Sequence, residues 1–216
     1  ILIEDVINCF SLSIEPKILR EAIIEMKSTG IPKRHLRRPF QIYEELMGVY
    51  NAIDIPNLVF QSIKLLKNKK INFPKLYLHV DEYQDLNTMD QEFIDQIIQS
   101  GNHEVVVCGD DEQSIYSFRH AYPAGIKSIW DSTNWEPIAF NKCSRLPNHI
   151  LRASRKLIEA HRGSHIAKQM EIPSETREKI ITFQCTKPDI ELRQIIKHIQ
   201  EIKSIKRKKD GNPISF

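Results

Sequence analysis

Cysteine is scarce in this sequence, and the patterns in which cysteine builds metal sites do not occur. The 216 residues contain four cysteines, and no two of them form a Cys-x-x-Cys pair. This argues against a zinc site and a disulfide scaffold, and it favours a reducing compartment such as the cytoplasm. His161 and His165 have a His-x₃-His spacing, but no cysteine pair accompanies them. We therefore interpret both as surface histidines.

Long hydrophobic runs are also missing. No apolar stretch reaches the roughly 20 residues that a membrane-spanning helix needs. The acidic first residues do not resemble a secretion signal. We therefore expect no membrane among the partners of this protein. The chain begins with isoleucine rather than methionine, and we expect it to be an excerpt of a longer protein.

A third absence concerns phosphate binding. The glycine-rich phosphate loop has the pattern Gly-x₄-Gly-Lys-[Ser/Thr], in which backbone N–H groups cradle the phosphates. The nearest approach to it is Gly125-Ile126-Lys127-Ser128, where an isoleucine separates the glycine from the lysine. No match occurs anywhere in the sequence. This limits the phosphate chemistry that we expect from the chain alone.

Composition and charge are compatible with one large domain or two small ones. Apolar residues make up 41% of the chain, and its net charge of +3 is weak support for a nucleic-acid partner. Basic residues cluster in the stretches 33–38, 64–70 and 203–209. For each cluster a solvated face is the more common interpretation, and a phosphate-binding stripe is the alternative.

Two short apolar runs that end abruptly at carboxylates organise the chain. Leu76–Val80 is followed by Asp81-Glu82-Tyr83-Gln84-Asp85, and Glu104–Cys108 is followed, after Gly109, by Asp110-Asp111-Glu112-Gln113. The runs have strand length and the spacing between them suits a crossover helix, so we expect two parallel strands. Ligands bind beyond the carboxyl ends of the strands in such sheets. The two acidic loops therefore form the candidate active edge.

The residues of these loops suit phosphate hydrolysis. Because side chains alternate along an extended backbone, Asp81 and Glu82 are expected to point in different directions. One can hold Mg²⁺ through its water shell, and the other can orient or activate the water that attacks a phosphate. An isolated Asp-Glu pair is more often a solvated acidic turn. Gln113 favours the functional interpretation, because a neutral amide can sense a γ-phosphate or its attacking water.

Two aromatic residues follow the second acidic loop. Tyr116 and Phe118 lie two residues apart, so they would share a face of an extended backbone. Aromatic side chains on one face can stack unpaired bases, at about 1–3 kcal/mol for each base. For a single aromatic residue a place in the core is the better interpretation. Two of them after a second strand-and-carboxylate unit favour base stacking.

These stretches resemble two motifs of the UvrD/Rep/PcrA family of superfamily-one DNA helicases. Asp81–Asp85 is similar to the second helicase motif of that family, and Gly109–Arg119 is similar to the third. The motifs occur in the right order and at a suitable distance. The resemblance implies that Asp81 holds Mg²⁺, that Glu82 orients or activates the hydrolytic water and that Gln113 contacts the γ-phosphate of ATP.

The same resemblance implies a DNA site and a link to it. Tyr116 and Phe118 would face single-stranded DNA. Gln84, Asp85 and Arg119 would couple the nucleotide site to the DNA site.

Arg145 carries a third, weaker match. It lies between a predicted strand, Glu136–Phe140, and a predicted helix, Pro147–His161, where a guanidinium can bind phosphate oxygens in bidentate fashion. Taken alone, a surface arginine is the more common interpretation. Its distance from the third motif resembles that of the family's fourth motif, usually Asn-Tyr-Arg-Ser, which implies that Arg145 is the γ-phosphate arginine. Departures from the family pattern are Cys143, Ser144 and Leu146 in this motif, and His120 where glycine is usual.

Periodicity and capping signals predict the remaining elements. The N-terminal 72 residues are predicted to be mostly helical, and Lys179–Cys185 is predicted to be a strand. In the first half of the chain we predict one helix from Pro16 to Gly30, one around the apolar stripe 42–50 and one capped by Asp54. A further helix is predicted to be capped by Thr88, with Gln91 as its capping-box partner, and to end near Gly101. The last two are one within 121–134 and Pro188–Ile205, whose inward-facing residues would be Leu192, Ile195, Ile196, Ile199 and Ile202.

From the resemblance we expect an α/β fold with a RecA-like parallel sheet flanked by helices. Residues 1–72 would form a helical insertion segment of the first motor domain. Residues 73–162 would form a partial RecA-like core with motifs II, III and IV, and residues 163–216 would lead into the second motor domain.

The expected function is that of part of an ATP-dependent 3′–5′ helicase and single-stranded-DNA translocase. Its cofactors would be ATP and Mg²⁺, and its partners single-stranded DNA and duplex junctions. Because the phosphate loop is missing, the excerpt alone is expected to be inactive as an ATPase. The alternative is a non-hydrolysing DNA-binding or regulatory remnant of such a motor. The residues retained at 81, 82, 113 and 145 count against that alternative.

Overall fold

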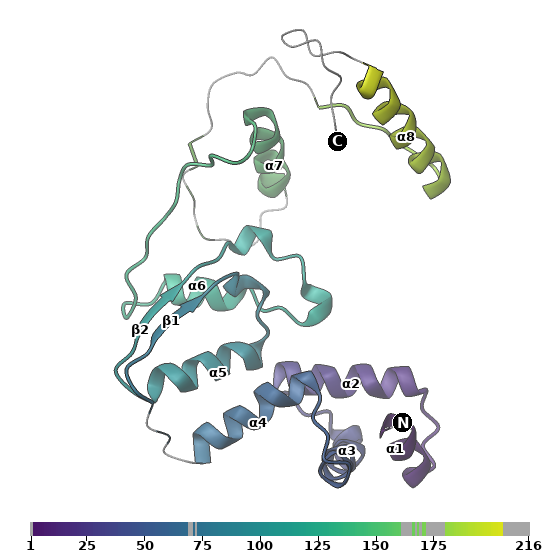
Figure 1. Cartoon of the computed structure of the whole chain (residues 1–216), viewed down its shortest axis with the longest axis vertical. Helices are drawn as coiled ribbons and strands as arrows, with labels where there is room; N and C mark the ends of the chain where they lie inside the picture. The colour runs from purple at the N-terminus through teal and green to yellow at the C-terminus, as the bar shows by residue number, and fades with distance from the viewer. Residues whose placement is uncertain are drawn as a thin grey trace. The chain divides into compact units, whose positions relative to one another are not determined.

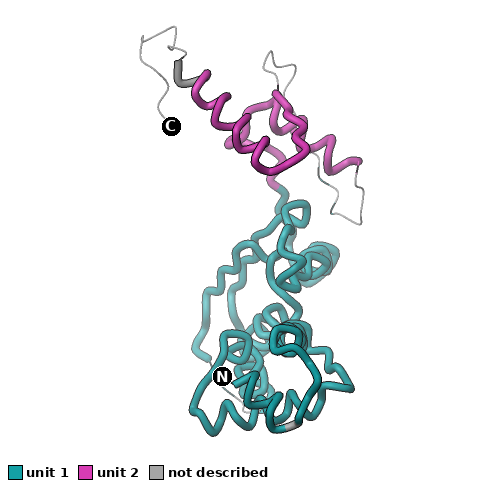
Figure 2. The backbone as a smooth tube through the Cα atoms, turned by 90° about the vertical axis from the view of Figure 1, so that its right-hand side faces the viewer, with its two compact units in different colours: residues 1–139, 162–168 teal, residues 140–161, 169–216 magenta. Residues whose placement is uncertain are grey.

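The computed structural model describes residues 2–68, 71, 73–160, 166, 168, 170–171 and 180–204. It divides the chain into two compact units (Figure 2). Unit 1 comprises residues 1–139 and 162–168, and unit 2 comprises residues 140–161 and 169–216. No helix of the described residues combines the length and the apolarity needed to cross a membrane.

The first part of unit 1 is helical, as predicted for the described residues of 1–72 (Figure 1). The helix α2 begins at Pro16, and Gly30 follows its last residue with a left-handed φ of 69°, so both predicted boundary signals are confirmed. The elements are α1 (Leu2–Phe10), α2 (Pro16–Thr29), the 3₁₀ helix η1 (Arg34–Leu36), α3 (Arg37–Val49) and α4 (Ile55–Asn68). The apolar core shared by α1, α2, η1 and α3 consists of Val6, Leu19, Ala22, Ile23, Met26, Leu36, Tyr43 and Met47.

A buried lysine joins three of these helices. The Lys27 side chain is 0% exposed, and its Nζ lies 2.8 Å from Glu44 Oε1 and 2.9 Å from Asp54 Oδ2. Nζ also lies 4.6 Å from the centroid of the Tyr43 ring. The Tyr43 hydroxyl donates to Asp54 Oδ2 at 2.6 Å. Burial and this hydrogen bond raise the pKa of Tyr43 above its usual range, so the hydroxyl stays protonated and remains a donor.

Asp54 has a second role as the cap of α4. Its Oδ1 accepts a hydrogen bond from the backbone N–H of Asn57 at 2.6 Å, which confirms the predicted cap. One carboxylate therefore both starts a helix and holds the buried ammonium of Lys27 against it.

The second part of unit 1 contains a parallel pair of strands, β1 (Tyr77–Val80) and β2 (Glu104–Val107). Their register pairs Tyr77 with Glu104 and Val80 with Val107. These are the only strands among the described residues, so the predicted parallel pairing is confirmed and a larger RecA-like sheet is not. The helix α5 (Thr88–Gln99) connects the strands and contacts α2 and α4 (Figure 1).

The predicted cap of α5, Thr88, was one residue late. Asn87, not Thr88, caps the helix, because its side chain accepts from the N–H groups of Met89 and Asp90, and the Asp90 side chain accepts from the Asn87 N–H in return. Gln91, the predicted capping-box partner, instead donates from Nε2 to the carbonyl oxygens of Leu86 and Tyr122. Asn87 caps the helix in place of Thr88 because asparagine is the more favourable N-cap residue.

Three short 3₁₀ helices and one α-helix complete unit 1. They are η2 (Tyr83–Asp85), η3 (Asp111–Gln113), η4 (Ser117–Arg119) and α6 (Ala124–Trp130). The helix α6 agrees with the prediction for 121–134. A second apolar cluster forms around Tyr83, Ile126 and Ile166. Burial raises the pKa of Tyr83 to about 12, so its hydroxyl is neutral.

Unit 2 contains the helices α7 (Asn148–Ala160) and α8 (Pro188–Ser204). Both were predicted, but most of their apolar side chains are not covered. Leu151 of α7 is 5% exposed, whereas Leu157 is 62% exposed. On α8 the predicted inward residues Leu192, Ile195, Ile196 and Ile199 are 57%, 44%, 46% and 38% exposed. The side chain of Ile202 lies outside the described residues.

Two predicted strands are wrong. Residues 136–140 form no strand, and Ile138 and Phe140 within them are 73% and 88% exposed. Residues 180–185, the described part of the other predicted strand, are also irregular. A strand requires a hydrogen-bonded neighbour. In both cases the apolar run is present, but no described strand lies beside it.

The network around Lys27 generates a stability prediction. We expect Lys27→Met to lower the free energy of unfolding of unit 1 by about 3 kcal/mol, because Glu44 and Asp54 would remain desolvated without a counter-charge. Urea denaturation followed by circular dichroism measures this change. The matched control is Lys67→Met, since Lys67 is 53% exposed and pairs with Glu92 at the surface. This control should cost less than about 1 kcal/mol. Equal losses in the two variants would contradict the assigned role of Lys27.

Candidate active site

The two acidic loops lie side by side at one edge of the sheet. Because β1 and β2 are parallel and in register, their carboxyl ends meet at the same edge. Two backbone hydrogen bonds continue the pairing beyond the strands, from the Cys108 N–H to the Val80 carbonyl at 2.7 Å and from the Tyr83 N–H to the Cys108 carbonyl at 3.0 Å. The backbone thus brings the two predicted loops together.

Glu82 adopts an unusual backbone conformation within the first loop. Its φ is 50° and its ψ is 43°, in the left-handed region that only glycine enters without strain. The expected alternation of Asp81 and Glu82 assumed extended backbone and does not apply here, because the chain turns at Glu82. The Glu82 N–H donates to Asp81 Oδ1 at 2.9 Å. Both carboxylates are exposed at the end of the strand.

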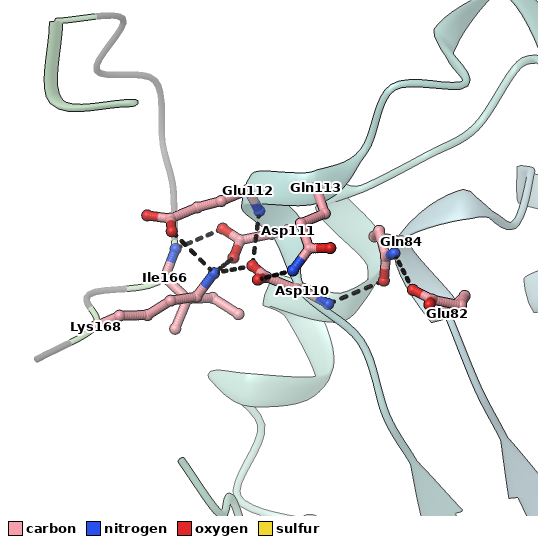
Figure 3. Close-up of polar contacts among 8 residues, drawn as sticks. All are labelled: Glu82, Gln84, Asp110, Asp111, Glu112, Gln113, Ile166 and Lys168. Atoms are coloured by element: carbon pink, nitrogen blue, oxygen red, sulfur yellow. Dashed lines mark hydrogen bonds and ion pairs between the residues drawn. The ribbon is translucent and has the colours of Figure 1, made fainter. Parts of the chain in front are cut away.

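Gln84 connects the first loop to the second. Its side chain is buried, with the residue 1% exposed. Its Nε2 donates to Glu82 Oε2 at 2.6 Å, and its Oε1 accepts from the backbone N–H of Asp110 at 2.9 Å (Figure 3). The Ser114 hydroxyl also donates to the Gln84 carbonyl oxygen at 3.2 Å. One amide therefore joins the predicted hydrolytic carboxylate to the second loop.

Gly109 permits this approach. A Cβ atom at this position would lie 2.6 Å from Gln84 Oε1 and 2.6 Å from Ile126 Cδ1. Neither neighbour can withdraw freely, because one is hydrogen-bonded and the other is buried. Only glycine fits between them.

Gln113 is held by Asp110, a residue to which the sequence analysis assigned no role. The Gln113 Nε2 donates to Asp110 Oδ2 at 2.6 Å, and Gln113 itself is exposed. Burial raises the pKa of Asp110, but hydrogen bonds from Lys168 and Gln113 outweigh it and hold the pKa below its usual value. Asp110 is therefore ionised at neutral pH and can only accept hydrogen bonds.

Lys168 was also missed. Its ammonium group donates to Asp110 Oδ1, and it lies 2.6 Å from Asp111 Oδ1. The sequence gives no local signal for this contact, because Lys168 lies 58 residues from Asp110. Asp110 could have been singled out, because it is the first carboxylate after β2 within the third motif.

Asp85, a predicted coupling residue, has a buried oxygen. Its backbone N–H donates to the Glu82 carbonyl at 2.9 Å. Its Oδ1 is buried and has no hydrogen-bond partner among the described residues. Such atoms are rare in folded proteins, and they occur at sites that another group completes.

The predicted DNA-facing aromatics lie together, although not on an extended backbone. Residues 117–119 form the 3₁₀ helix η4, and the Tyr116 and Phe118 rings meet edge to face with centroids 5.8 Å apart. The Arg119 guanidinium lies 5.7 Å from the Tyr116 ring centroid. Phe118 is 74% exposed, which rules out the alternative place for it in the described core.

A cavity of about 380 Å³ opens next to Phe118. It lies between the helices α2 and α4, the start of α5 and η4. Its lining includes apolar side chains such as Ile24 and Met89 and polar ones such as Ser28 and Asp90, together with Phe118, Arg119 and His120. The cavity is large enough for a planar ring with polar edges.

His120 replaces the glycine that is usual after the third motif, and it adopts the glycine-like conformation. Its φ is 63° and its ψ is 26°. The backbone of this turn is therefore strained at His120.

Arg145 belongs to unit 2 and precedes α7. Its side chain is exposed. The backbone N–H groups of Leu146 and Arg145 bond the Cys143 sulfur and lower the pKa of the Cys143 thiol. His161 and His165 lie outside the described residues. No group of three or more histidine, cysteine, aspartate or glutamate side chains among the described residues is arranged to hold a metal ion.

Comparison with known proteins decides the family. The profile of the UvrD/REP helicase N-terminal domain matches residues 8–134, which is more than half of the chain. The chain belongs to the UvrD/REP helicase family.

Several relatives support this assignment. The chain is 31% identical over 148 residues to the ATP-dependent DNA helicase Rep of Buchnera aphidicola, a match that covers 66% of the chain and 23% of that relative. It is 32% identical over 125 residues to the Rep helicase of Escherichia coli, covering 55% of the chain and 18% of the relative. DNA helicase II of Escherichia coli is 28% identical over 149 residues, covering 64% and 20%. The chain thus spans about a fifth of these UvrD/REP helicases.

The strained turn at His120 generates a second prediction. We expect His120→Gly to raise the free energy of unfolding by about 0.5 kcal/mol, because relief of left-handed strain exceeds the added entropy of the unfolded chain. The urea midpoint at constant slope measures this gain. The control is Ser117→Gly in the same turn, where φ is not positive. It should lower stability by about 0.5 kcal/mol, and a loss in both variants would show that the His120 side chain is needed for packing.

Proposed function

We propose that this chain is part of an ATP-dependent translocase and helicase that acts on single-stranded DNA. The observation that carries the proposal is the continuous contact from Glu82 through Gln84 and Asp110 to Gln113 (Figure 3). It places a carboxylate and an amide of the types needed for phosphoryl transfer at one sheet edge. The names of the relatives, ATP-dependent DNA helicase Rep and DNA helicase II, support the same reaction.

The proposed domain organisation follows the motifs. Residues 73–162 would be part of a RecA-like core, for which the β1–α5–β2 unit with parallel strands is the support. Residues 1–72 would be a helical insertion, and residues 163–216 would lead into a second motor domain. The longer protein would supply the remaining strands and the phosphate loop, and the chain alone is proposed not to hydrolyse ATP.

The donor set at the sheet edge fits Mg²⁺ and a nucleotide phosphate. Asp81 is an exposed carboxylate directly after a strand, and Mg²⁺ in nucleotide sites is held by one or two carboxylates together with phosphate oxygens and water. Asp81 would hold the ion. Bound Mg²⁺-ATP would supply the phosphoryl group and neutralise its developing charge.

The other residues would act on water and on the phosphate. Glu82 would orient the attacking water and accept its proton, and the hydrogen bond from Gln84 would fix the carboxylate for that task. Gln113 would present its amide to the γ-phosphate. Arg145 would bind a phosphate in bidentate fashion, a role proposed from the resemblance alone.

The DNA site would lie on η4 and beside it. Phe118 would stack an unpaired base, since it is exposed and its ring is supported edge to face by Tyr116. The cavity next to Phe118 would receive a base edge. Arg119 would contribute positive charge, and it also contacts the Tyr116 ring. Duplex junctions as substrates and 3′–5′ movement are proposed from the resemblance.

Coupling between the two sites would run through the second loop. Ser114 lies between Gln113 and Tyr116 in the chain, and its hydroxyl bonds the Gln84 carbonyl. A movement of Gln113 on γ-phosphate release would therefore displace the aromatic residues Tyr116 and Phe118, which follow in the same loop. The buried Oδ1 of Asp85 would gain its partner in another state of this cycle.

The role of Glu82 is testable in the longer polypeptide that carries this chain and a phosphate loop. We expect Glu82→Gln to lower DNA-stimulated ATP turnover at least about 100-fold, because an amide cannot accept the proton. Nucleotide affinity should stay nearly unchanged, because the new amide oxygen can still accept from Gln84. Steady-state kinetics and nucleotide titration measure the two effects.

The matched control for this variant is Glu104→Gln. Glu104 lies at the opposite end of the same sheet and pairs with Lys75 at the surface. Its replacement should leave turnover unchanged. If Glu82→Gln turned over ATP like the control, or if the unmodified polypeptide were inactive, a non-hydrolysing remnant would be the better description.

The role of Phe118 is tested by DNA affinity. We expect Phe118→Ala to weaken binding of a short oligothymidylate about tenfold, the loss of one stacked base. Fluorescence anisotropy at fixed salt measures the affinity. Ile115→Ala is the control, because Ile115 is 72% exposed in the same loop and has no aromatic ring. Equal affinities of the two variants would exclude Phe118 from the DNA site.

A further inference from the structure

The chain returns to unit 1 after α7 through two anchored residues. Ile166 is 7% exposed and packs with Tyr83 and Ile126. Its backbone N–H donates to Asp111 Oδ2 at 2.7 Å. Lys168 follows two residues later and is the last residue of unit 1. Ile166 is therefore held by apolar contacts with Tyr83 and Ile126 and by a hydrogen bond to Asp111 of η3.

Lys168 compensates a concentration of negative charge. Three consecutive carboxylates meet its ammonium group, which donates to Asp110 and lies 2.6 Å from Asp111 and 3.6 Å from Glu112 (Figure 3). Burial lowers the pKa of Lys168, but the bonds to Asp110 and Asp111 outweigh it and raise the pKa above its usual value. The Lys168 side chain is 20% exposed and that of Asp111 is 4% exposed. This is not the geometry of a solvated surface pair.

Asp110 orients two side-chain amides, one through its carboxylate and one through its backbone N–H. With one carboxylate oxygen bonded to Lys168, the other accepts from Gln113 Nε2. An ionised carboxylate only accepts, so the Gln113 amide must turn its NH₂ group toward Asp110. The Asp110 backbone N–H only donates, so the Gln84 amide must turn its oxygen toward Asp110 and its NH₂ group toward Glu82.

We propose that Lys168 is a positioning residue of the hydrolytic site, which holds the Asp110 carboxylate so that Asp110 orients the Gln113 amide. Lys168 itself touches no reacting atom. The assignment rests on the proposed function for the role of Gln113, and it extends that function to a residue outside the three motifs.

The orientation of Gln113 is measured directly by NMR on the 216-residue chain. The side-chain amide resonances of Gln113 and the carboxyl carbon of Asp110 are followed in Lys168→Met, Lys168→Arg and a control, Lys127→Met. Lys127 lies in α6 and pairs with Asp131, the residue that follows this helix. We expect Lys168→Met to shift the Gln113 resonances and to raise the Asp110 titration midpoint. Lys168→Arg should restore both, and Lys127→Met should change neither.

A second measurement needs no variant. Groups that face Asp110 and titrate are Asp111, Glu112 and Lys168, and Glu82 lies beyond Gln84 (Figure 3). Because the pKa of Asp110 is depressed in the folded protein, its contacts persist above that pKa and are lost as the pH falls through it. The side-chain amide resonances of Gln113 should therefore change with pH, and the midpoint of that change should equal the titration midpoint of the Asp110 carboxyl group. The proposal is overturned if the Gln113 amide resonances change neither when Asp110 titrates nor when Lys168 is replaced by methionine.

Kinetics in the longer polypeptide separate positioning from stability. We expect Lys168→Met to lower kcat about tenfold and to change KM for ATP by less than about twofold, with recovery in Lys168→Arg. Loss of kcat that arginine does not restore would contradict positioning by charge. If the unmodified polypeptide hydrolysed no ATP, the proposed function would fail, whereas the NMR measurements would still decide whether Lys168 orients Gln113.

Discussion

The side chain of Gln84 is the contact on which the arrangement of the site depends. Parallel pairing brings two loops to one edge, but it does not fix the side chains within them. Gln84 does, because both ends of its amide are engaged and the group is buried. Separating the loops would leave buried polar groups unpaired, at about 1–3 kcal/mol for each group. Gly109 makes this contact possible, since a larger residue at this position would keep the second loop away from the Gln84 side chain.

The fold was predictable where the signal is local. Pro16, Gly30 and Asp54 mark helix ends by their own backbone chemistry, and the structure confirms all three. The failures concern residues whose state depends on distant partners. Apolar periodicity correctly predicted α7 and α8, but it cannot say whether anything covers the apolar face. The run at 136–140 has strand composition, yet a strand forms only where a neighbour offers its hydrogen bonds.

The candidate site shows the same division. Glu82, Gln84 and Gln113 could be singled out because their motifs are continuous in sequence, and the structure brings them into one network. The reason given for the directions of Asp81 and Glu82 was wrong, because it assumed extended backbone at a turn. Lys168 could not be found from local pattern, since its contact with Asp110 spans 58 residues of chain. Long-range ion pairs are set by the fold, and only the fold shows them.

The left-handed conformation of Glu82 has its own consequence for the site. Such a residue costs about 1–2 kcal/mol, and it persists only where the surroundings determine it completely. Here the N–H of Glu82 bonds Asp81, its carbonyl accepts from Asp85, and its carboxylate accepts from Gln84. The position of the carboxylate is thus set by backbone and neighbours together, and it does not depend on a free choice of rotamer. In the proposed role of Glu82 as a base, a carboxylate held in this way would need little reorganisation when substrate arrives.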